Sequence, residues 1–160
     1  MTPLHVLVCS AKHDLRIYQF IIDKNLDALL VKDKWGEVPV VYLLISGPPI
    51  EIIHYFLETH QQHWNGMPIE FKDVIVKLAI VKSAEYVKLM ARTLIPYFPD
   101  LLVDWYSIFD FCATSGMVTL PVFWALVEVS MSNRSNCMST EHKENIDEII
   151  NVMFSLHTTP

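Results

Sequence analysis

The fold is decided by residues 33–58, which read Asp-Lys-Trp-Gly-Glu-Val-Pro-Val-Val-Tyr-Leu-Leu-Ile-Ser-Gly-Pro-Pro-Ile-Glu-Ile-Ile-His-Tyr-Phe-Leu-Glu. Gly36 indicates a tight loop, and Pro39 suits the first turn of a helix, where a backbone N–H would be unpaired in any case. Gly47 can adopt the left-handed conformation that commonly ends a helix, and Pro49 can open the next one. The stretch therefore predicts a loop followed by two short helices.

Both predicted helices are strongly apolar. The first covers residues 40–45, and the second places Ile52, Ile53, Phe56 and Leu57 on one face. A single pair of helices this short cannot bury that much apolar surface by itself. The unit is therefore expected to stack on neighbouring units like itself.

Two parts of the chain resemble the ankyrin repeat. In the first, Asp33, Gly36 and Pro39 precede a short apolar helix that ends at Ser46-Gly47. In the second, residues 2–5 read Thr-Pro-Leu-His, which is the most characteristic tetrapeptide of that family.

The better-formed repeat departs from the family pattern at two positions. Val38 and Val41 stand where the family has the Thr and the His that hydrogen-bond each other. Because both polar partners are replaced together by apolar residues, no unpaired polar group is expected there.

The resemblance implies an all-α fold, an α-solenoid of about four stacked helix-turn-helix (ankyrin-like) repeats. A polar, Asn- and Ser-rich linker is expected at 130–138, and the one-sided helix after it suits a terminal cap. We therefore expect a single ankyrin-like repeat domain over residues 1–160, with repeats at about 2–32, 33–66, 67–99 and 100–131 and a C-terminal capping helix at 139–155.

Helix signals in the other repeats are weaker but traceable. In the first repeat, Thr2 and Asp14 are expected to cap helices that run to about Lys12 and to Lys24. The residues of the second of these helices expected to face inward are Leu15, Ile17, Phe20 and Ile21. Further helices are predicted at 73–81, 84–95 and 122–127.

Composition and charge exclude several classes of protein. The chain has 160 residues, of which 52% are hydrophobic and 19% charged, which is enough for one substantial core. No uninterrupted apolar run reaches the ~18 residues that a membrane span requires, so a soluble protein is expected. The net charge of −6 and the scattered Lys and Arg argue against non-specific binding of nucleic acid.

The cysteines and the N-terminus indicate an intracellular, cytoplasmic protein. Cys9, Cys112 and Cys137 are odd in number and far apart, as is usual for free thiols in a reducing compartment. No secretory signal is visible, because a charged segment followed by an apolar one is missing from the start. Cys112 lies in an apolar run, which predicts a buried, unreactive thiol.

The family resemblance implies that a protein partner binds to the turn tips and to the exposed edge of the first helices. Carried over position by position, the expected partner-binding residues are Lys34, Trp35, Glu37, Ile45, Ser46, Thr114 and Ser115. Trp35 stands out, because exposed Trp is enriched among binding hot spots. It can also pack beneath a neighbouring loop, as Trp105 in the matching loop suggests, and the sequence leaves both alternatives open.

Motifs for catalysis, metals and cofactors are missing from the sequence. His54, His60 and His63 have spacing near that of metal ligands, but no Cys or carboxylate completes a zinc set, and a solvated helix end is expected instead. The sequence holds no Gly-rich phosphate loop, His-Glu-x-x-His or Gly-x-Ser-x-Gly. It therefore predicts no enzyme and no cofactor.

Three functions remain open. The first is a non-catalytic scaffold that binds a protein partner of unknown identity. The second is a structural or self-associating segment of a longer repeat array, because the first helix pair has no cap before it. The third is a helical ligand-binding domain or an enzyme, favoured only by the high hydrophobic content.

Overall fold

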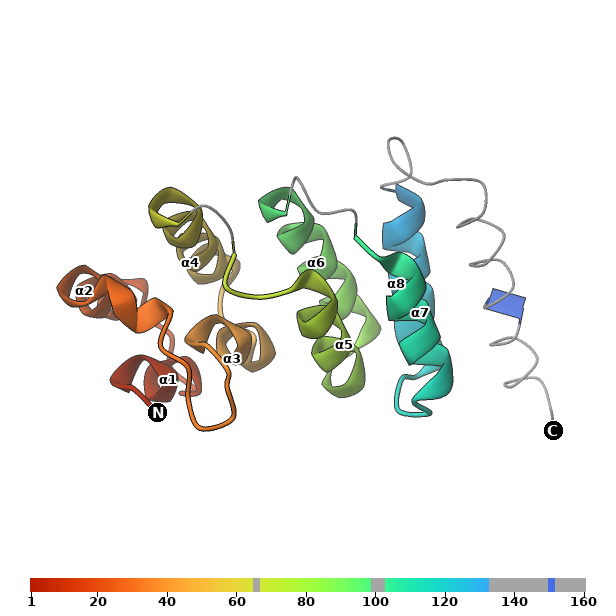
Figure 1. The fold of residues 1–160 in the computed structure, drawn as a ribbon, viewed down its shortest axis with the longest axis horizontal. Coiled ribbons are helices and arrows are strands. Elements are labelled where there is room, and N and C mark those ends of the chain that lie inside the picture. Colours follow the sequence, from red (N-terminus) through yellow and green to blue (C-terminus); the bar gives the residue numbers. More distant parts are fainter. Residues whose placement is uncertain (65–66, 99–102, 133–149, 152–160) are drawn as a thin grey trace. The chain divides into compact units, whose positions relative to one another are not determined.

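The computed structural model describes residues 1–64, 67–98, 103–132 and 150–151 of the chain (Figure 1). Within these residues every regular element is a helix and no strand forms. The prediction of an all-α fold is therefore confirmed. The chain divides into two compact units, unit 1 (Met1–Glu70) and unit 2 (Phe71–Pro160).

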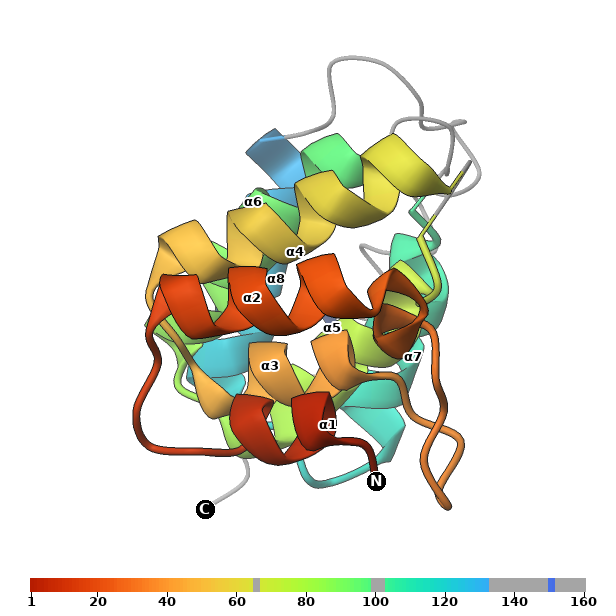
Figure 2. The same ribbon diagram turned by 90° about the vertical axis from the view of Figure 1, so that its left-hand side faces the viewer.

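Unit 1 contains two helix pairs that pack against each other (Figure 2). Its elements are α1 (Pro3–Val8), α2 (Leu15–Lys24), the 3-10 helix η1 (Leu26–Leu29), α3 (Pro39–Ser46) and α4 (Ile50–His63). Helix α1 packs on α2 and α3, and helix α4 packs on α2 and α3. The pairs thus stack with first helix against first helix and second helix against second helix.

Local chemistry sets the ends of these helices. Thr2 and His5 form a capping box at the start of α1, and the Asp14 side chain accepts a hydrogen bond from the first turn of α2. Pro39 occupies the first turn of α3, and Gly47, with a φ of 77°, ends that helix in the left-handed conformation. The predicted roles of Pro39 and Gly47 are confirmed.

Helix α1 ends at Val8, so the prediction that it runs to about Lys12 is wrong. The backbone N–H of Ser10 donates to the carbonyl oxygen of Leu7 at 3.0 Å, and the Ser10 hydroxyl donates to the carbonyl of Lys12 at 2.8 Å. A serine that bonds to nearby backbone stabilises a turn in competition with the helix. The side chains after Val8 are mostly exposed, so a longer helix would bury little.

The buried face of α2 differs from the predicted one. The sequence predicts that Ile17 and Phe20 face inward, yet 47% and 64% of their surfaces are exposed. Tyr18 and Ile22 are buried instead. The Tyr18 hydroxyl can enter the core because it donates to the carbonyl oxygen of Leu7 at 3.3 Å, which leaves no unpaired polar group.

The core of unit 1 is built mostly from apolar side chains. Leu15 and Ile21 of α2 are half-buried at its edge. Val38 and Val41 are both buried, so the two positions that are apolar where the ankyrin repeat has a polar pair lie in the core. The largest fully buried side chains of this unit are Leu4, Tyr18, Ile22, Leu29, Leu43, Leu44, Ile52, Ile53, Phe56 and Leu57.

Unit 2 is also formed by packed helices. Its elements are α5 (Phe71–Val81), α6 (Ala84–Leu94), the 3-10 helix η2 (Ile95–Tyr97), α7 (Trp105–Thr114) and α8 (Leu120–Ser132). Helix α5 packs on α6 and α7, and helix α8 packs on α6 and α7. The predicted helices at 73–81 and 84–95 are confirmed with small shifts at their ends.

Aromatic and charged side chains connect the helices of unit 2. The Phe71 ring makes edge contacts with Phe98 and Trp105, and the Trp105 ring stacks on Phe109. At the surface Lys88 of α6 forms an ion pair with Glu128 of α8. These contacts join α5 to α7 and α6 to α8.

The polar segment at 130–138 does not begin where the sequence predicts. Helix α8 continues to Ser132, and Ser130 is buried, with its hydroxyl donating to the carbonyl oxygen of Val127 at 2.8 Å. Because that bond satisfies the hydroxyl, the helix can carry a serine into the core. The rest of the segment and most of the predicted capping helix at 139–155 lie outside the described residues, although Ile150 and Asn151 are helical.

Candidate functional site

The loop before α3, residues 33–37, is held in shape by the Asp33 side chain. One carboxylate oxygen of Asp33 accepts the backbone N–H groups of Trp35 at 2.9 Å and of Glu37 at 3.2 Å. The other oxygen accepts the Tyr42 hydroxyl of α3 at 2.7 Å. Gly36 has a φ of 83°, which lets the chain turn back so that the N–H of Asp33 donates to the carbonyl oxygen of Glu37 at 2.9 Å.

These hydrogen bonds also affect the titration of the two side chains. Burial acts to raise the pKa of Asp33, but the hydrogen bonds from Tyr42 and from the backbone of Trp35 and Glu37 outweigh it and lower that pKa. Burial and the Asp33 carboxylate raise the pKa of Tyr42 to about 12. At neutral pH the ionised Asp33 carboxylate therefore accepts a hydrogen bond from the protonated Tyr42 hydroxyl, and this bond holds the loop against α3.

A second contact ties the loop to α1. The Nε2 atom of the buried His5 lies 3.1 Å from the carbonyl oxygen of Glu37. A carbonyl can only accept, so Nε2 carries the proton, and Nδ1 accepts from the Thr2 hydroxyl at 2.8 Å and from the Thr2 N–H at 3.2 Å. The loop is thus fixed at both ends, by α1 and by α3.

The fixed loop presents an exposed aromatic side chain. Trp35 has 62% of its surface exposed, and the Lys34 ammonium lies 4.1 Å from the centre of its ring. That distance suits a cation–π contact, which orients the two side chains together. Of the two alternatives left by the sequence, Trp35 is exposed, whereas Trp105 of unit 2 is buried.

The other predicted partner-binding residues lie in different surroundings. Glu37, Ile45 and Ser46 are half-buried, and the Ser46 hydroxyl donates to the carbonyl oxygen of Leu43 at 2.9 Å. Lys34, Trp35 and Glu37 belong to one loop, while Ile45 and Ser46 lie at the C-terminal end of α3. The structure therefore places these five residues at the two ends of one short helix.

In unit 2 the C-terminal end of α7 carries the remaining two predicted residues, Thr114 as the last residue of the helix and Ser115 as its C-cap. Thr114 is exposed, and its hydroxyl donates to the carbonyl oxygen of Asp110 at 2.8 Å. Ser115 is half-buried, and its hydroxyl accepts the backbone N–H of Met117 at 3.3 Å. The Thr114 hydroxyl thus bonds within α7, and the Ser115 hydroxyl stabilises the turn that follows.

The histidines of α4 do not form the solvated helix end that the sequence predicts. His63 is exposed, but His60 is fully buried beside the Trp64 ring, and neither of its ring nitrogens has a hydrogen-bond partner among the described residues. Burial lowers the pKa of His60 to about 4. No group of three or more potential metal ligands occurs in the described part of the chain.

Cys112 agrees with the expectation from its apolar surroundings. Its side chain is buried in unit 2, and burial raises the pKa of the thiol to about 12. The thiolate, which is the reactive form, is therefore absent at neutral pH. The prediction that Cys112 is buried is confirmed.

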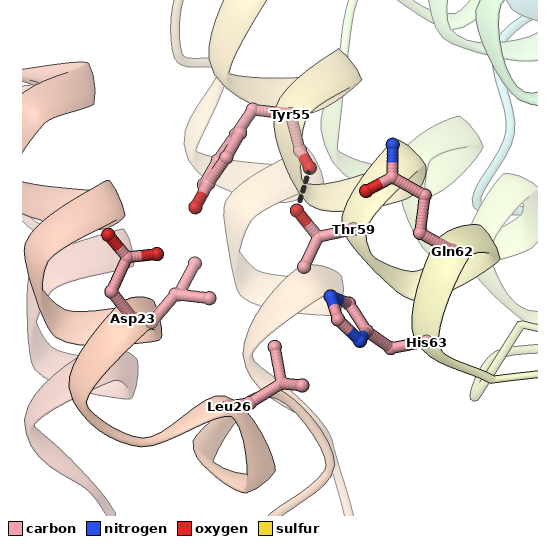
Figure 3. Close-up of a pocket in the computed structure, with 7 residues that line it drawn as sticks. Asp23, Leu26, Tyr55, Thr59, Gln62 and His63 are labelled. Atoms are coloured by element: carbon pink, nitrogen blue, oxygen red, sulfur yellow. Dashed lines mark hydrogen bonds between the residues drawn. The ribbon is translucent and has the colours of Figure 1, made fainter.

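A polar pocket in unit 1 was not found by sequence reasoning. It has a volume of about 520 Å³ and lies between the end of α2, η1 and the second half of α4 (Figure 3). Its lining residues are Ile22, Asp23, Leu26, Tyr55, Thr59, Gln62 and His63. They come from two separate helix pairs, so no local motif marks them.

A second, more apolar groove lies on the outer side of α1 and α2. It has a volume of about 330 Å³, and the exposed Phe20 and Val31 are part of its wall. Its remaining lining residues are Thr2, Pro3, Leu4, Ile21, Lys24, Asn25 and Ala28.

The chain was compared with protein-family models, with curated proteins and with solved structures, and none of them matches it. In the described residues no helix combines the length and the apolar character needed to cross a lipid bilayer.

Proposed function

We propose that the chain is a non-catalytic scaffold of ankyrin-like repeats that binds a protein partner through its turn tips. Support for the ankyrin-like repeat comes from the hydrogen-bonded Thr2 and His5, from the left-handed Gly47 and from the stacking of α1 on α3 and α2 on α4. Each of these features lies at the position that the family resemblance assigns to it.

The observation that carries the proposed function is the presentation of Trp35. A large aromatic side chain with 62% of its surface exposed adds nothing to the core, yet Asp33, His5 and Tyr42 hold its loop in one conformation. A preorganised loop loses little conformational entropy on binding. Trp is also among the residues most enriched in hot spots of protein interfaces.

The test is to capture binding proteins with the wild-type chain and with Trp35→Ala, and then to measure the affinity of each purified candidate. We expect Trp35→Ala to remove at least about 2 kcal/mol of binding free energy, as hot-spot residues do. The melting temperature should stay close to that of the wild type, because the side chain is exposed.

Val81→Ala provides a matched control. Val81 is also an exposed large apolar residue, 57% accessible, but it ends α5 in unit 2. The Val81→Ala variant should bind each captured protein as tightly as the wild type does. If no captured protein distinguishes Trp35→Ala from Val81→Ala, the proposed role of the loop is wrong.

A second candidate function is self-association through the outer face of α1 and α2. Phe20 is 64% exposed and forms part of the rim of the apolar groove. Two copies related by a twofold axis can each place Phe20 in the groove of the other, since such an interface is self-complementary. Light scattering on the wild type and on Phe20→Ser tests this directly. A strictly monomeric wild type would remove this candidate.

A further inference from the structure

The pocket between α2 and α4 combines an apolar floor with a polar rim. Ile22 is buried and Leu26 half-buried, while Asp23 and His63 are exposed. Figure 3 shows the Tyr55 hydroxyl on the same side of the pocket as the Asp23 carboxylate, with the His63 ring across from them. A ligand that fits must be apolar along its stem and polar at its tip.

The Asp23 carboxylate is the charged group of this rim. The ammonium of the neighbouring Lys24 lies 5.8 Å from the centre of the Phe20 ring, and Lys24 lines the other groove and not this pocket. Burial, and secondarily the charge of Asp23, raise the pKa of Tyr55, so a protonated hydroxyl stands within the field of the carboxylate. The rim therefore favours a cation.

Thr59 contributes to the wall without offering a competing donor. Its hydroxyl already donates to the carbonyl oxygen of Tyr55 at 2.6 Å, which Figure 3 marks with a dashed line. The aromatic rings of Tyr55 and His63 border the remaining space. A flat cation can stack on such rings and still reach the carboxylate.

We propose that this pocket receives the guanidinium group of an arginine side chain from the protein partner, an inference that rests on the proposed scaffold function. Arginine has the required shape, because its three-carbon stem matches the apolar floor and its planar fork matches a carboxylate. The volume of about 520 Å³ lies within the range of pockets that enclose small ligands. The partner thus carries an exposed arginine in addition to the epitope that meets Trp35.

The experiment is a titration of the full chain with N-acetyl-arginine amide, followed by NMR at the backbone amides. We expect saturable shifts at Asp23, Tyr55 and His63 and none at Trp35. N-acetyl-citrulline amide has nearly the same shape without the charge, and it should bind about tenfold more weakly. Shifts that are equal for both ligands, or absent for the arginine derivative, would overturn the inference.

Matched variants assign the effect to the carboxylate. Asp23→Asn should weaken the binding of N-acetyl-arginine amide about tenfold. Asp27→Asn should leave it unchanged, because Asp27 is an exposed carboxylate on η1 that does not line the pocket. An equal loss in both variants would mean a general charge effect and would contradict a specific site.

Agmatine distinguishes the two possible sources of a guanidinium group. It lacks a peptide backbone, so binding of agmatine without binding of N-acetyl-arginine amide would show a site for a free small cation and overturn the assignment to a protein side chain. Failure of the proposed scaffold function would appear in the capture experiment with Trp35→Ala and not in these titrations. In that case arginine still binds at Asp23, but no captured protein depends on Trp35.

Discussion

The imidazole Nε2 of His5 lies 3.1 Å from the backbone carbonyl oxygen of Glu37 and thereby joins α1 to the loop that precedes α3. On its other side the same ring accepts hydrogen bonds from Thr2. One buried side chain therefore takes part in the capping box of α1, connects the two helix pairs of unit 1 and helps to fix the loop that presents Trp35.

Replacing this imidazole should destabilise unit 1. His5→Leu removes one of the two donors to the Glu37 carbonyl and the side-chain half of the capping box of α1, and it leaves the Thr2 N–H and hydroxyl without their acceptor. We expect a loss of about 2 to 4 kcal/mol in urea unfolding. Thr2→Ser keeps a hydroxyl at the cap and should cost less than about 1 kcal/mol. If His5→Leu unfolds at the same urea concentration as the wild type, the hydrogen bonds of His5 do not stabilise the fold.

Core packing between the helix pairs can be tested on α4. Ile53 is fully buried, so Ile53→Ala should cost about 2 to 5 kcal/mol through the lost apolar burial and the cavity left behind. Ile50 begins the same helix and is 38% exposed, so Ile50→Ala serves as the matched control with a loss below about 1 kcal/mol. Similar losses for both variants in denaturant melts would contradict this picture of the core.

The buried His60 should make stability depend on pH. Its pKa is about 4 in the folded chain, below the ordinary value of about 6.5, so the unfolded chain binds more protons between these pH values. Stability is then complete above about pH 6.5 and falls as the pH decreases toward 4. From pH 7 to pH 5 this residue should remove about 2 kcal/mol.

His60→Leu isolates that contribution. The variant lacks the two ring nitrogens that have no hydrogen-bond partner among the described residues, so at pH 7 it should be as stable as the wild type or more stable. Between pH 7 and pH 5 it should lose about 2 kcal/mol less than the wild type. Parallel pH profiles for the two chains would show that His60 titrates normally in the folded state.

Gly36 provides a test of loop preorganisation. Its φ of 83° is unfavourable for other residues, and a Cβ atom added there would meet no atom within 4 Å. Gly36→Ala should therefore cost about 1 to 2 kcal/mol through backbone strain alone. Gly36→Asn should cost less, because Asn tolerates the left-handed conformation. A stabilised Gly36→Ala variant in thermal unfolding would contradict the loop geometry.

The sequence by itself determined most of the helices. Pro39, Gly47 and Asp14 act on the backbone within one turn, so their effects do not depend on the rest of the chain. Capping chemistry of this kind is local. The capping residues therefore predict where α2, α3 and α4 begin or end to within a residue or two, without knowledge of how the helices pack.

Tertiary structure decided which of the large aromatic side chains are buried. Tyr18 rather than Phe20 enters the core, since the carbonyl oxygen of Leu7 in α1 accepts a hydrogen bond from the Tyr18 hydroxyl. Trp35 is exposed, while Trp105 is buried among aromatic rings. These outcomes depend on neighbours far away in sequence. The pocket around Asp23 has the same origin, because it exists only where α2 and α4 lie side by side. A carboxylate and a tyrosine on two different helices carry no shared signal in the sequence.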